Sequence, residues 1–134
     1  MPYAPKRGDT LLIPSGPSHD PDRMHLHCVL TGACGEEMHL VVCIESIVEG
    51  AFHDPTCELA DGEHEFVTKP SYVNFRRTQC FKVARLTKMV DGWLYKPKPP
   101  LSEALLERIC EGVLASKMTP RGMKDYFAKQ VPPK

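Results

Sequence analysis

The stretch "HLHCVLTGACGEEMHLVVCIESI" (residues 25–47) contains two apolar segments joined by a polar one. Its first segment, "HLHCVLT" (25–31), alternates between histidine and apolar side chains, which is the period of a half-buried β-strand. The last segment, "MHLVVCIESI" (38–47), is apolar enough to be a strand buried on both faces. Because "GACGEE" (32–37) lies between them and has the composition of a turn, we expect the two strands to form a hairpin.

Shorter strands are expected on both sides of this hairpin. "TLLIP" (10–14) is an apolar run followed by a loop, "SGPSHDPDR" (15–23), that is dense in Pro, Gly, Ser and Asp. Later segments predict a short strand around "HEFV" (64–67), strands at "SYVNF" (71–75) and "TQCFKVARL" (78–86), and a small hairpin in "KMVDGWLY" (88–95) that turns at Asp91-Gly92. The next residues, "KPKPP" (96–100), are expected to be an extended Pro-rich connector.

After the connector the apolar period changes to that of a helix. "LSEALLERICEGVLAS" has Ser102 in position to cap the N-terminus and Glu103 in the first turn. The helical spacing places five apolar side chains on one face: Leu105, Leu106, Ile109, Val113 and Leu114. The sequence therefore predicts one amphipathic helix packed on the sheet.

A second helix is expected in "TPRGMKDYFAKQ", with Thr119 as its cap and Pro120 at its first helical position. Its apolar face consists of Met123, Tyr126 and Phe127. Strands followed by helices predict an α+β fold in which helices cover a small, strongly bent antiparallel sheet. We expect one domain over 1–134, with a barrel at about 6–95, the connector at 96–100 and helices at about 102–129.

Composition limits the classes of function. Hydrophobic residues make up 42% and charged residues 25% of the 134 residues, as in an ordinary globular domain. Lys and Arg total 17 and Asp and Glu also total 17, so the formal net charge is zero. This balance excludes a strongly basic nucleic-acid coat but allows a local basic patch. No apolar run approaches the roughly 20 residues that a membrane span needs, so no membrane association is expected.

The cysteines and the start of the chain bear on location. "MPYAPKRGDT" has no apolar core of the kind found in a secretory signal. Three of the six cysteines lie inside apolar or alternating runs, where a reduced cysteine acts as a small buried hydrophobe. We therefore expect a cytoplasmic protein in which all six are thiols: Cys28, Cys34, Cys43, Cys57, Cys80 and Cys110.

Residues 53–77, "HDPTCELADGEHEFVTKPSYVNFRR", are rich in reactive side chains. His53, Cys57 and His64, with His25 or His27, contain the nitrogen and sulfur atoms that zinc prefers. The close ligand pair that usually starts a zinc site is missing, so the sequence favours no metal. Cys57 beside a histidine could be a nucleophile, but nothing in the sequence indicates an exposed thiol or a lowered pKa, as a reactive cysteine requires.

Acid–base cleavage of a phosphodiester is the third possibility. It needs a base for the 2′-OH proton, an acid for the leaving oxygen and cations for the phosphate, and His and Arg can supply all three without a metal. The chain offers these groups: His25, His27, His53, His64, Arg23, Arg76 and Arg77. Neighbours on a strand point to opposite faces, so only one of Arg76 and Arg77 can face a given groove. Tyr72 and Phe75 could stack on bases or belong to the core.

Several segments resemble the MazF/PemK family of toxin endoribonucleases. They are "KRGDTLLIP" followed by a Pro/Ser/Asp loop, "MHLHCVLT", "HLVVCIESI", "RRTQCFKVARL" and "PLSEALLERICEGVL". The resemblance implies an SH3-like barrel with a terminal helix, a homodimer, and cleavage of single-stranded RNA at short sequences. It also implies a cognate antitoxin protein that covers the RNA groove.

The family's functional residues are only partly matched. Its Arg-Pro at the start of the second strand is His25-Leu26 here, with Arg23 two residues earlier, and Ser46 corresponds to the Thr or Ser that ends the next strand. Aligning the family's late Gln with Gln79 places Arg76 on a family Arg. The same alignment puts Thr78 where the PemK branch has Asp, and most of "GAFHDPTCELADGEHEFVTKP" is an insertion relative to the family.

The preferred hypothesis is a toxin-type endoribonuclease that needs no metal or cofactor. Arg76, or failing it Arg77, would hold the scissile phosphate, and His25 or His53 would be the acid–base group. The candidate catalytic residues are His25, His53, Ser46 and Arg76, and the candidate RNA-binding residues are Arg23, His64, Tyr72 and Arg77. The alternative is a non-catalytic barrel that binds a protein partner or nucleic acid.

Overall fold

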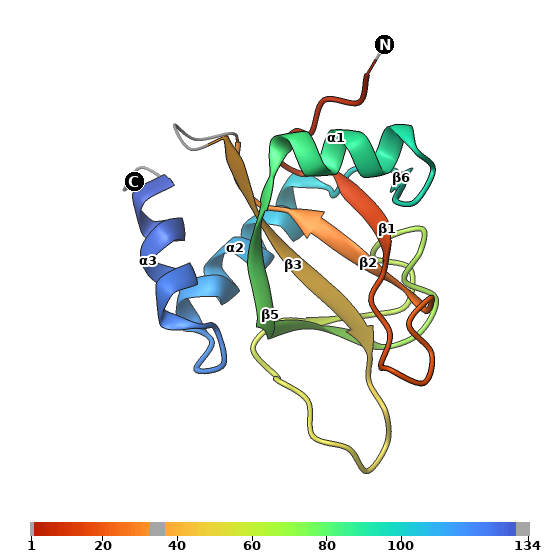
Figure 1. The fold of residues 1–134 in the computed structure, drawn as a ribbon. Coiled ribbons are helices and arrows are strands. Elements are labelled where there is room, and N and C mark those ends of the chain that lie inside the picture. Colours follow the sequence, from red (N-terminus) through yellow and green to blue (C-terminus); the bar gives the residue numbers. More distant parts are fainter. Residues whose placement is uncertain (1, 33–36, 131–134) are drawn as a thin grey trace.

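The computed structural model describes residues 2–32 and 37–130. Within these residues the chain forms an α+β fold with a curled, six-stranded antiparallel sheet and three helices (Figure 1). The strand order across the sheet is β4-β5-β3-β2-β1-β6. The strands are β1 (Thr10–Pro14), β2 (Met24–Val29), β3 (Met38–Ser46), β4 (Glu58–Leu59), β5 (Ser71–Lys82) and β6 (Lys96–Lys98). The helices are α1 (Val83–Asp91), α2 (Glu103–Ala115) and α3 (Arg121–Gln130).

The hairpin expected in residues 25–47 is confirmed. β2 and β3 pair antiparallel, with Leu26 opposite Ile44 and Val29 opposite Val41. Both strands lie in the interior of the sheet, between β1 and β5, which agrees with their apolar composition. The central part of the expected turn, residues 33–36, lies outside the described residues, as does Cys34.

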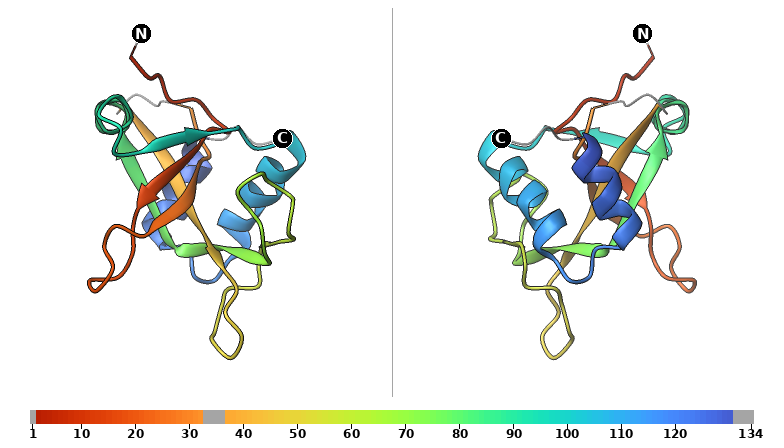
Figure 2. Two further views of the ribbon diagram at one scale, coloured as in Figure 1. Left: turned by 90° about the vertical axis from the view of Figure 1, so that its right-hand side faces the viewer. Right: turned by 90° about the vertical axis from the view of Figure 1, so that its left-hand side faces the viewer.

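The two faces of the sheet carry different helices. One face, here called the helix face, bears Leu26, Cys28, Val42 and Ile44 and packs against apolar side chains of α2 and α3. The opposite face bears His25, His27, Cys43 and Glu45 near the middle of the sheet, and we call it the site face. Its Val29–Val41 end packs with Phe81 and with Leu86 of α1. Figure 2 shows α2 and α3 together on one side of the sheet.

Strand β5 bends sharply in its middle. Val41 pairs with Gln79 and Cys43 pairs with Asn74, so residues 75–78 of β5 lie opposite Val42 alone. The bend is visible in Figure 1 as the corner in β5. The Phe75 side chain at this corner is fully buried and packs closely against Gly112 of α2. This extra length changes which side chains of β5 face the site.

The first expected helix is confirmed as α2. Its N-cap is Ser102, whose hydroxyl accepts a hydrogen bond of 3.2 Å from the Leu105 backbone N–H, and Glu103 stands in the first turn. Four of the five predicted core side chains are buried: Leu105, Leu106, Ile109 and Val113. The fifth, Leu114, is 50% exposed, because it is one position beyond the face that Val113 occupies.

Helix α3 also lies where it was expected, but its cap differs. Phe127 is buried, and Met123 and Tyr126 pack against the same core. The Thr119 hydroxyl is buried and has no hydrogen-bond partner in the described part of the chain, so the prediction that it caps the helix is wrong. The Pro120 carbonyl accepts from the Met123 and Lys124 N–H groups, and α3 begins at Arg121, so Pro120 precedes the helix instead of occupying its first position.

The region between the sheet and α2 differs most from expectation. Residues 83–91, expected to be strand and hairpin, form α1, because Leu86, Met89 and Val90 are spaced to place one helical face on the sheet. Residues 96–98 are the edge strand β6 rather than only a connector, and they pair with β1. The short strand expected around 64–67 is absent from the described residues, and Glu58–Leu59 pairs with β5 instead.

The five described cysteines form no disulfide. Burial raises the pKa of the thiols of Cys57 and Cys110, and it raises that of Cys43 to about 12. None of the helices in residues 2–32 and 37–130 combines the length and the apolarity needed to cross a membrane.

Candidate functional site

A row of side chains crosses the site face at right angles to the strands. Glu45 of β3 lies opposite Tyr72 of β5, and Tyr72 lies opposite Glu58 of β4. On the other side of Glu45, the pairing of the neighbouring residues of β2 and β3 brings His25 into the same row. His53, from the loop before β4, closes the row through a contact of 2.7 Å between its Nε2 and Glu58 Oε2. The row thus has an imidazole at each end.

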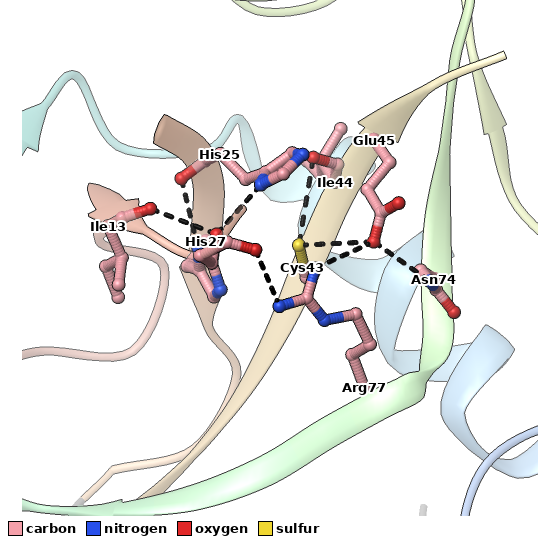
Figure 3. Close-up of polar contacts among 9 residues, drawn as sticks. Ile13, His25, His27, Cys43, Ile44, Glu45, Asn74 and Arg77 are labelled. Carbon is pink, nitrogen blue, oxygen red and sulfur yellow. Dashed lines mark hydrogen bonds and ion pairs between the residues drawn. The ribbon is translucent and has the colours of Figure 1, made fainter. Parts of the chain in front are cut away.

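An arginine and a glutamate form the centre of the site. Arg77 Nη1 lies 3.3 Å from Glu45 Oε2, and Arg77 Nη2 donates a 3.0 Å hydrogen bond to the Ser15 carbonyl. The same Glu45 oxygen accepts a 2.9 Å hydrogen bond from Asn74 Nδ2 (Figure 3). Burial alone would raise the pKa of Glu45, but the hydrogen bonds from Asn74 and Arg77 outweigh it, so the pKa is lowered. Glu45 is therefore a carboxylate at neutral pH and holds the guanidinium over the sheet.

His25 lies beside this ion pair. Its Nδ1 is 2.8 Å from Ser15 Oγ, and the ring is half-buried. Burial lowers the pKa of His25 and the charges of Arg77 and Arg23 lower it further, against the opposing effect of Glu45. The imidazole is thus neutral at pH 7.

These side chains line one pocket of about 320 Å³, a size that suits a small ligand group. Its lining residues are Ser15, Gly16, Pro17, Arg23, His25, Glu45 and Arg77. Two guanidinium groups, one carboxylate and a neutral imidazole therefore meet at one opening of the site face. Such a set can bind an anion and can accept a proton.

The sharp bend in β5 decides which arginine reaches this pocket. Before the bend, Tyr72 and Asn74 point to the site face; after it, Arg77 and Gln79 do so. Continuing the alternation from Asn74 would have placed Arg76 there. Arg76 instead contacts Met118 through its Nη2, at 3.9 Å from the sulfur. The structure therefore brings Arg77, and not Arg76, to His25.

His53 and His25 share a face but do not meet. Three strand-to-strand steps separate β2 from β4, and each step is about 4.8 Å, so the two ends of the row are roughly 10 to 15 Å apart. The His53 ring packs against Tyr72 with 5.2 Å between ring centroids. His53 is thus placed to contact a neighbouring part of a long ligand rather than the same atom as His25.

His64 is a structural residue of the insertion. Its side chain is buried, its Nε2 lies 2.7 Å from the Pro99 carbonyl, and its Nδ1 accepts a hydrogen bond from the Phe66 backbone N–H. A nitrogen that accepts from an N–H is unprotonated, so Nε2 carries the proton and donates it to Pro99. Both nitrogens are used within the fold, and we leave His64 out of the candidate site.

Ser46 and Phe75 lie away from the pocket for the same geometric reason. Ser46 follows Glu45 on β3, so its side chain points to the opposite face, where it pairs with Ser71. Phe75 belongs to the core on the helix face. The structure therefore groups Arg23, His25 and Arg77 and leaves Ser46, His64 and Arg76 elsewhere.

The zinc and thiol alternatives find no geometric support. Within residues 2–32 and 37–130, no group of three or more His, Cys, Asp or Glu side chains is placed to hold a metal ion. Cys57 is buried, and burial raises its pKa, whereas nucleophilic and metal-binding cysteines are thiolates. Asp54, in the same insertion, is buried and accepts hydrogen bonds from Ser116 and Thr56.

Three residues of the site were not predicted from the sequence: Ser15, Glu45 and Asn74. Glu45 had a usable signal, because a carboxylate within the apolar run "HLVVCIES" needs a partner if that strand is buried. Ser15 and Asn74 had no such signal in the sequence. Strand pairing brings Asn74 to the site, and the path of the β1–β2 loop brings Ser15 there.

His27 gives the site face a measurable pH dependence. It is 3% exposed, and burial lowers its pKa to about 4, although its hydrogen bond to the His25 carbonyl acts in the opposite direction. An unfolded histidine takes up its proton near pH 6.5. Between these values the unfolded chain binds more protons, so stability must fall as the pH falls.

We expect the contribution of His27 to lower the free energy of unfolding by about 2 kcal/mol between pH 7 and pH 5. Urea unfolding of the wild type and of His27→Gln measures it, because glutamine keeps an N–H donor but does not titrate. His25 contributes in the same direction in both proteins and cancels in the comparison. Equal pH dependence in the two proteins would contradict the assignment.

Comparisons with known proteins give the chain no family assignment: neither a protein-family model nor a curated protein sequence matches it.

Proposed function

We propose that the protein is a metal-independent endoribonuclease that acts on single-stranded RNA. The observation that carries this proposal is the placement of His25, Glu45 and Arg77, from three different strands, around one pocket of the site face. Arg77 would bind the scissile phosphate, and Arg23 lines the same pocket. Glu45 positions the guanidinium and does not itself need to touch the substrate.

In this mechanism His25 is the general base. When the Ser15 hydroxyl donates to the Ile13 carbonyl, 3.1 Å away, its oxygen accepts from the His25 Nδ1–H. That tautomer leaves Nε2 unprotonated and able to take the proton of the ribose 2′-OH. The 2′-oxygen then attacks the phosphorus, and the bond from phosphorus to the 5′-oxygen breaks. Tyr72, which lies opposite Glu45 in the same row, would give its phenolic proton to the departing oxygen.

This chemistry predicts a 2′,3′-cyclic phosphate at the new 3′ end and no requirement for a metal. Incubating the purified protein with a mixed-sequence RNA, with and without EDTA, and analysing the fragments by mass spectrometry tests both. Activity that EDTA abolishes, or fragments without the cyclic phosphate, would contradict the mechanism. Intact RNA after prolonged incubation would contradict the function.

The pH profile of cleavage provides a separate test. Only neutral His25 can act as the base, and its pKa is lowered from the ordinary 6.5. We therefore expect kcat/KM to be independent of pH around pH 7. Below the lowered pKa, which lies under 6.5, kcat/KM should fall tenfold for each unit by which the pH is lowered. A rate that declines with a midpoint above 6.5 would assign the base to another group.

We further propose, from the sequence resemblance and the curled antiparallel sheet, that the chain is a divergent SH3-like barrel of the MazF/PemK type. On this proposal it is the toxin of a toxin–antitoxin pair, acts in the cytoplasm as a homodimer, and is held inactive by an antitoxin protein that covers the site face. Expression of the chain alone should then arrest growth, and the arrest should disappear when Arg77 is replaced.

A non-catalytic binding role is the second candidate, and one observation favours it. The Arg77 guanidinium is already paired with the Glu45 carboxylate and hydrogen-bonded to the Ser15 carbonyl. These contacts fix its position before any ligand binds, which is what a binding site requires. A binding protein of this kind would retain RNA or an acidic protein segment without cutting it. Tight binding of an RNA that remains intact over the full pH range would decide for this role.

A further inference from the structure

A second pocket, of about 440 Å³, adjoins the pocket that contains His25. The two pockets share Ser15 and Arg77 in their linings, so Arg77 stands between them. The second pocket extends toward α1 along the part of β5 that follows the bend. Its polar lining includes Gln79, Lys82 and Arg85.

The charge of this second pocket is one-sided. Three cationic side chains line it, Arg77, Lys82 and Arg85, of which only Arg77 is paired with a carboxylate of the described residues, Glu45; no Asp or Glu is among the lining residues. Lys82 and Arg85 are exposed, and in the described part of the chain neither forms a salt bridge. Arg85 lies within 3.4 Å of the buried Tyr95 hydroxyl, through its Nη2. In a chain with zero net charge, this concentration of cations in one hollow points to an anionic ligand.

We propose that this second pocket binds the phosphate next to the scissile one, so that the substrate is an RNA strand of at least three nucleotides held across Arg77. Arg85 and Lys82 contact the second phosphate, and the Gln79 amide lies at the intervening nucleotide, where it can donate and accept hydrogen bonds. The inference rests on the proposed function for the identity of the strand, but it concerns binding and not the cleavage step.

Binding is measured with 2′-O-methyl oligonucleotides, which cannot be cut because the attacking hydroxyl is blocked. A dinucleotide has one phosphate and a trinucleotide has two when neither carries a terminal phosphate. For the wild type we expect the trinucleotide to bind about tenfold more tightly than the dinucleotide. In Arg85→Gln that gain should fall to about twofold, with the dinucleotide affinity unchanged.

Lys88→Gln is the matched control, because Lys88 is an exposed cation on the same helix that does not line the pocket. The Lys88→Gln variant should still bind the trinucleotide about tenfold more tightly than the dinucleotide. The salt dependence gives a second readout: for the trinucleotide, the slope of log affinity against log salt should lessen by about 0.7 in Arg85→Gln and stay unchanged in Lys88→Gln. Circular dichroism checks that both variants are folded.

The outcomes separate this inference from the proposed function. Equal affinities for the two oligonucleotides, or an Arg85→Gln variant that behaves as the wild type, would overturn the second phosphate site even if the protein cleaves RNA. Arg85-dependent binding by a protein that leaves unmodified RNA intact would support the site and overturn the nuclease function.

Discussion

Arg77→Gln is expected to lower kcat/KM for RNA cleavage by about 10²- to 10³-fold, whereas Arg76→Gln should stay within about twofold of the wild type. The two residues are adjacent in sequence and have the same charge. Arg77 lines both pockets of the site face, while Arg76 lies against Met118 on the other side of the bend. In the proposed mechanism, losing the guanidinium at 77 would remove the group that neutralises charge on the phosphate as the 2′-oxygen attacks.

The comparison also separates catalysis from folding. The ion pair of Arg77 with Glu45 is partly exposed, with 38% and 21% of the two side chains accessible, so its contribution to stability is at most about 1 kcal/mol. Cleavage assays with a fluorescent RNA, run beside urea unfolding of each variant, measure both quantities. Equal losses in the two variants, or a larger loss at 76, would place the phosphate on the opposite face and contradict the site.

Gly112→Ala is expected to lower the free energy of unfolding by about 3 kcal/mol. Replacing glycine by alanine inside a helix normally stabilises the protein, by up to about 1 kcal/mol. A Cβ at 112 would lie 2.5 Å and 2.9 Å from two carbons of the Phe75 ring. That ring is fully buried, and it stands at the corner of β5, so it cannot move aside without moving the bend.

Gly122→Ala in α3 is the control, since a Cβ there would meet nothing within 4 Å. It should stabilise by about 0.4 to 1 kcal/mol. Urea unfolding of both variants gives the comparison. Adding Phe75→Leu to Gly112→Ala should cost less than the sum of the two single changes, because the smaller side chain relieves the clash. If Gly112→Ala were as stable as Gly122→Ala, the close packing of α2 on the bend would be refuted.

Much of the fold follows from local patterns. The β2–β3 hairpin has clear alternation and apolar runs, and α2 has both a cap and a helical stripe, so each is recognisable without tertiary information. The segment "TQCFKVARL" is ambiguous, because its apolar residues fit a strand as far as Lys82 and a helix after it. Only the packing of Leu86 on the sheet settles where the change occurs.

The site was less accessible from the sequence. His25, Arg23 and Arg77 could be selected by residue type, but the choice between the two arginines depends on the four residues of β5 that lie opposite Val42. No local pattern encodes that number. His64 resembled a surface ligand because its loop is polar, yet a contact with Pro99, 35 positions away in the chain, buries it.

The outer strand β6 has a consequence for assembly. It consists of Lys96, Pro97 and Lys98 and forms one margin of the sheet. Pro97 has no N–H to offer to a further strand, and two lysines at the margin would repel the same segment of a second molecule. At the opposite margin, β4 is only two residues long. Growth of the sheet from one molecule into the next is thereby discouraged at both margins, so the proposed homodimer would be built from side-chain contacts between surfaces.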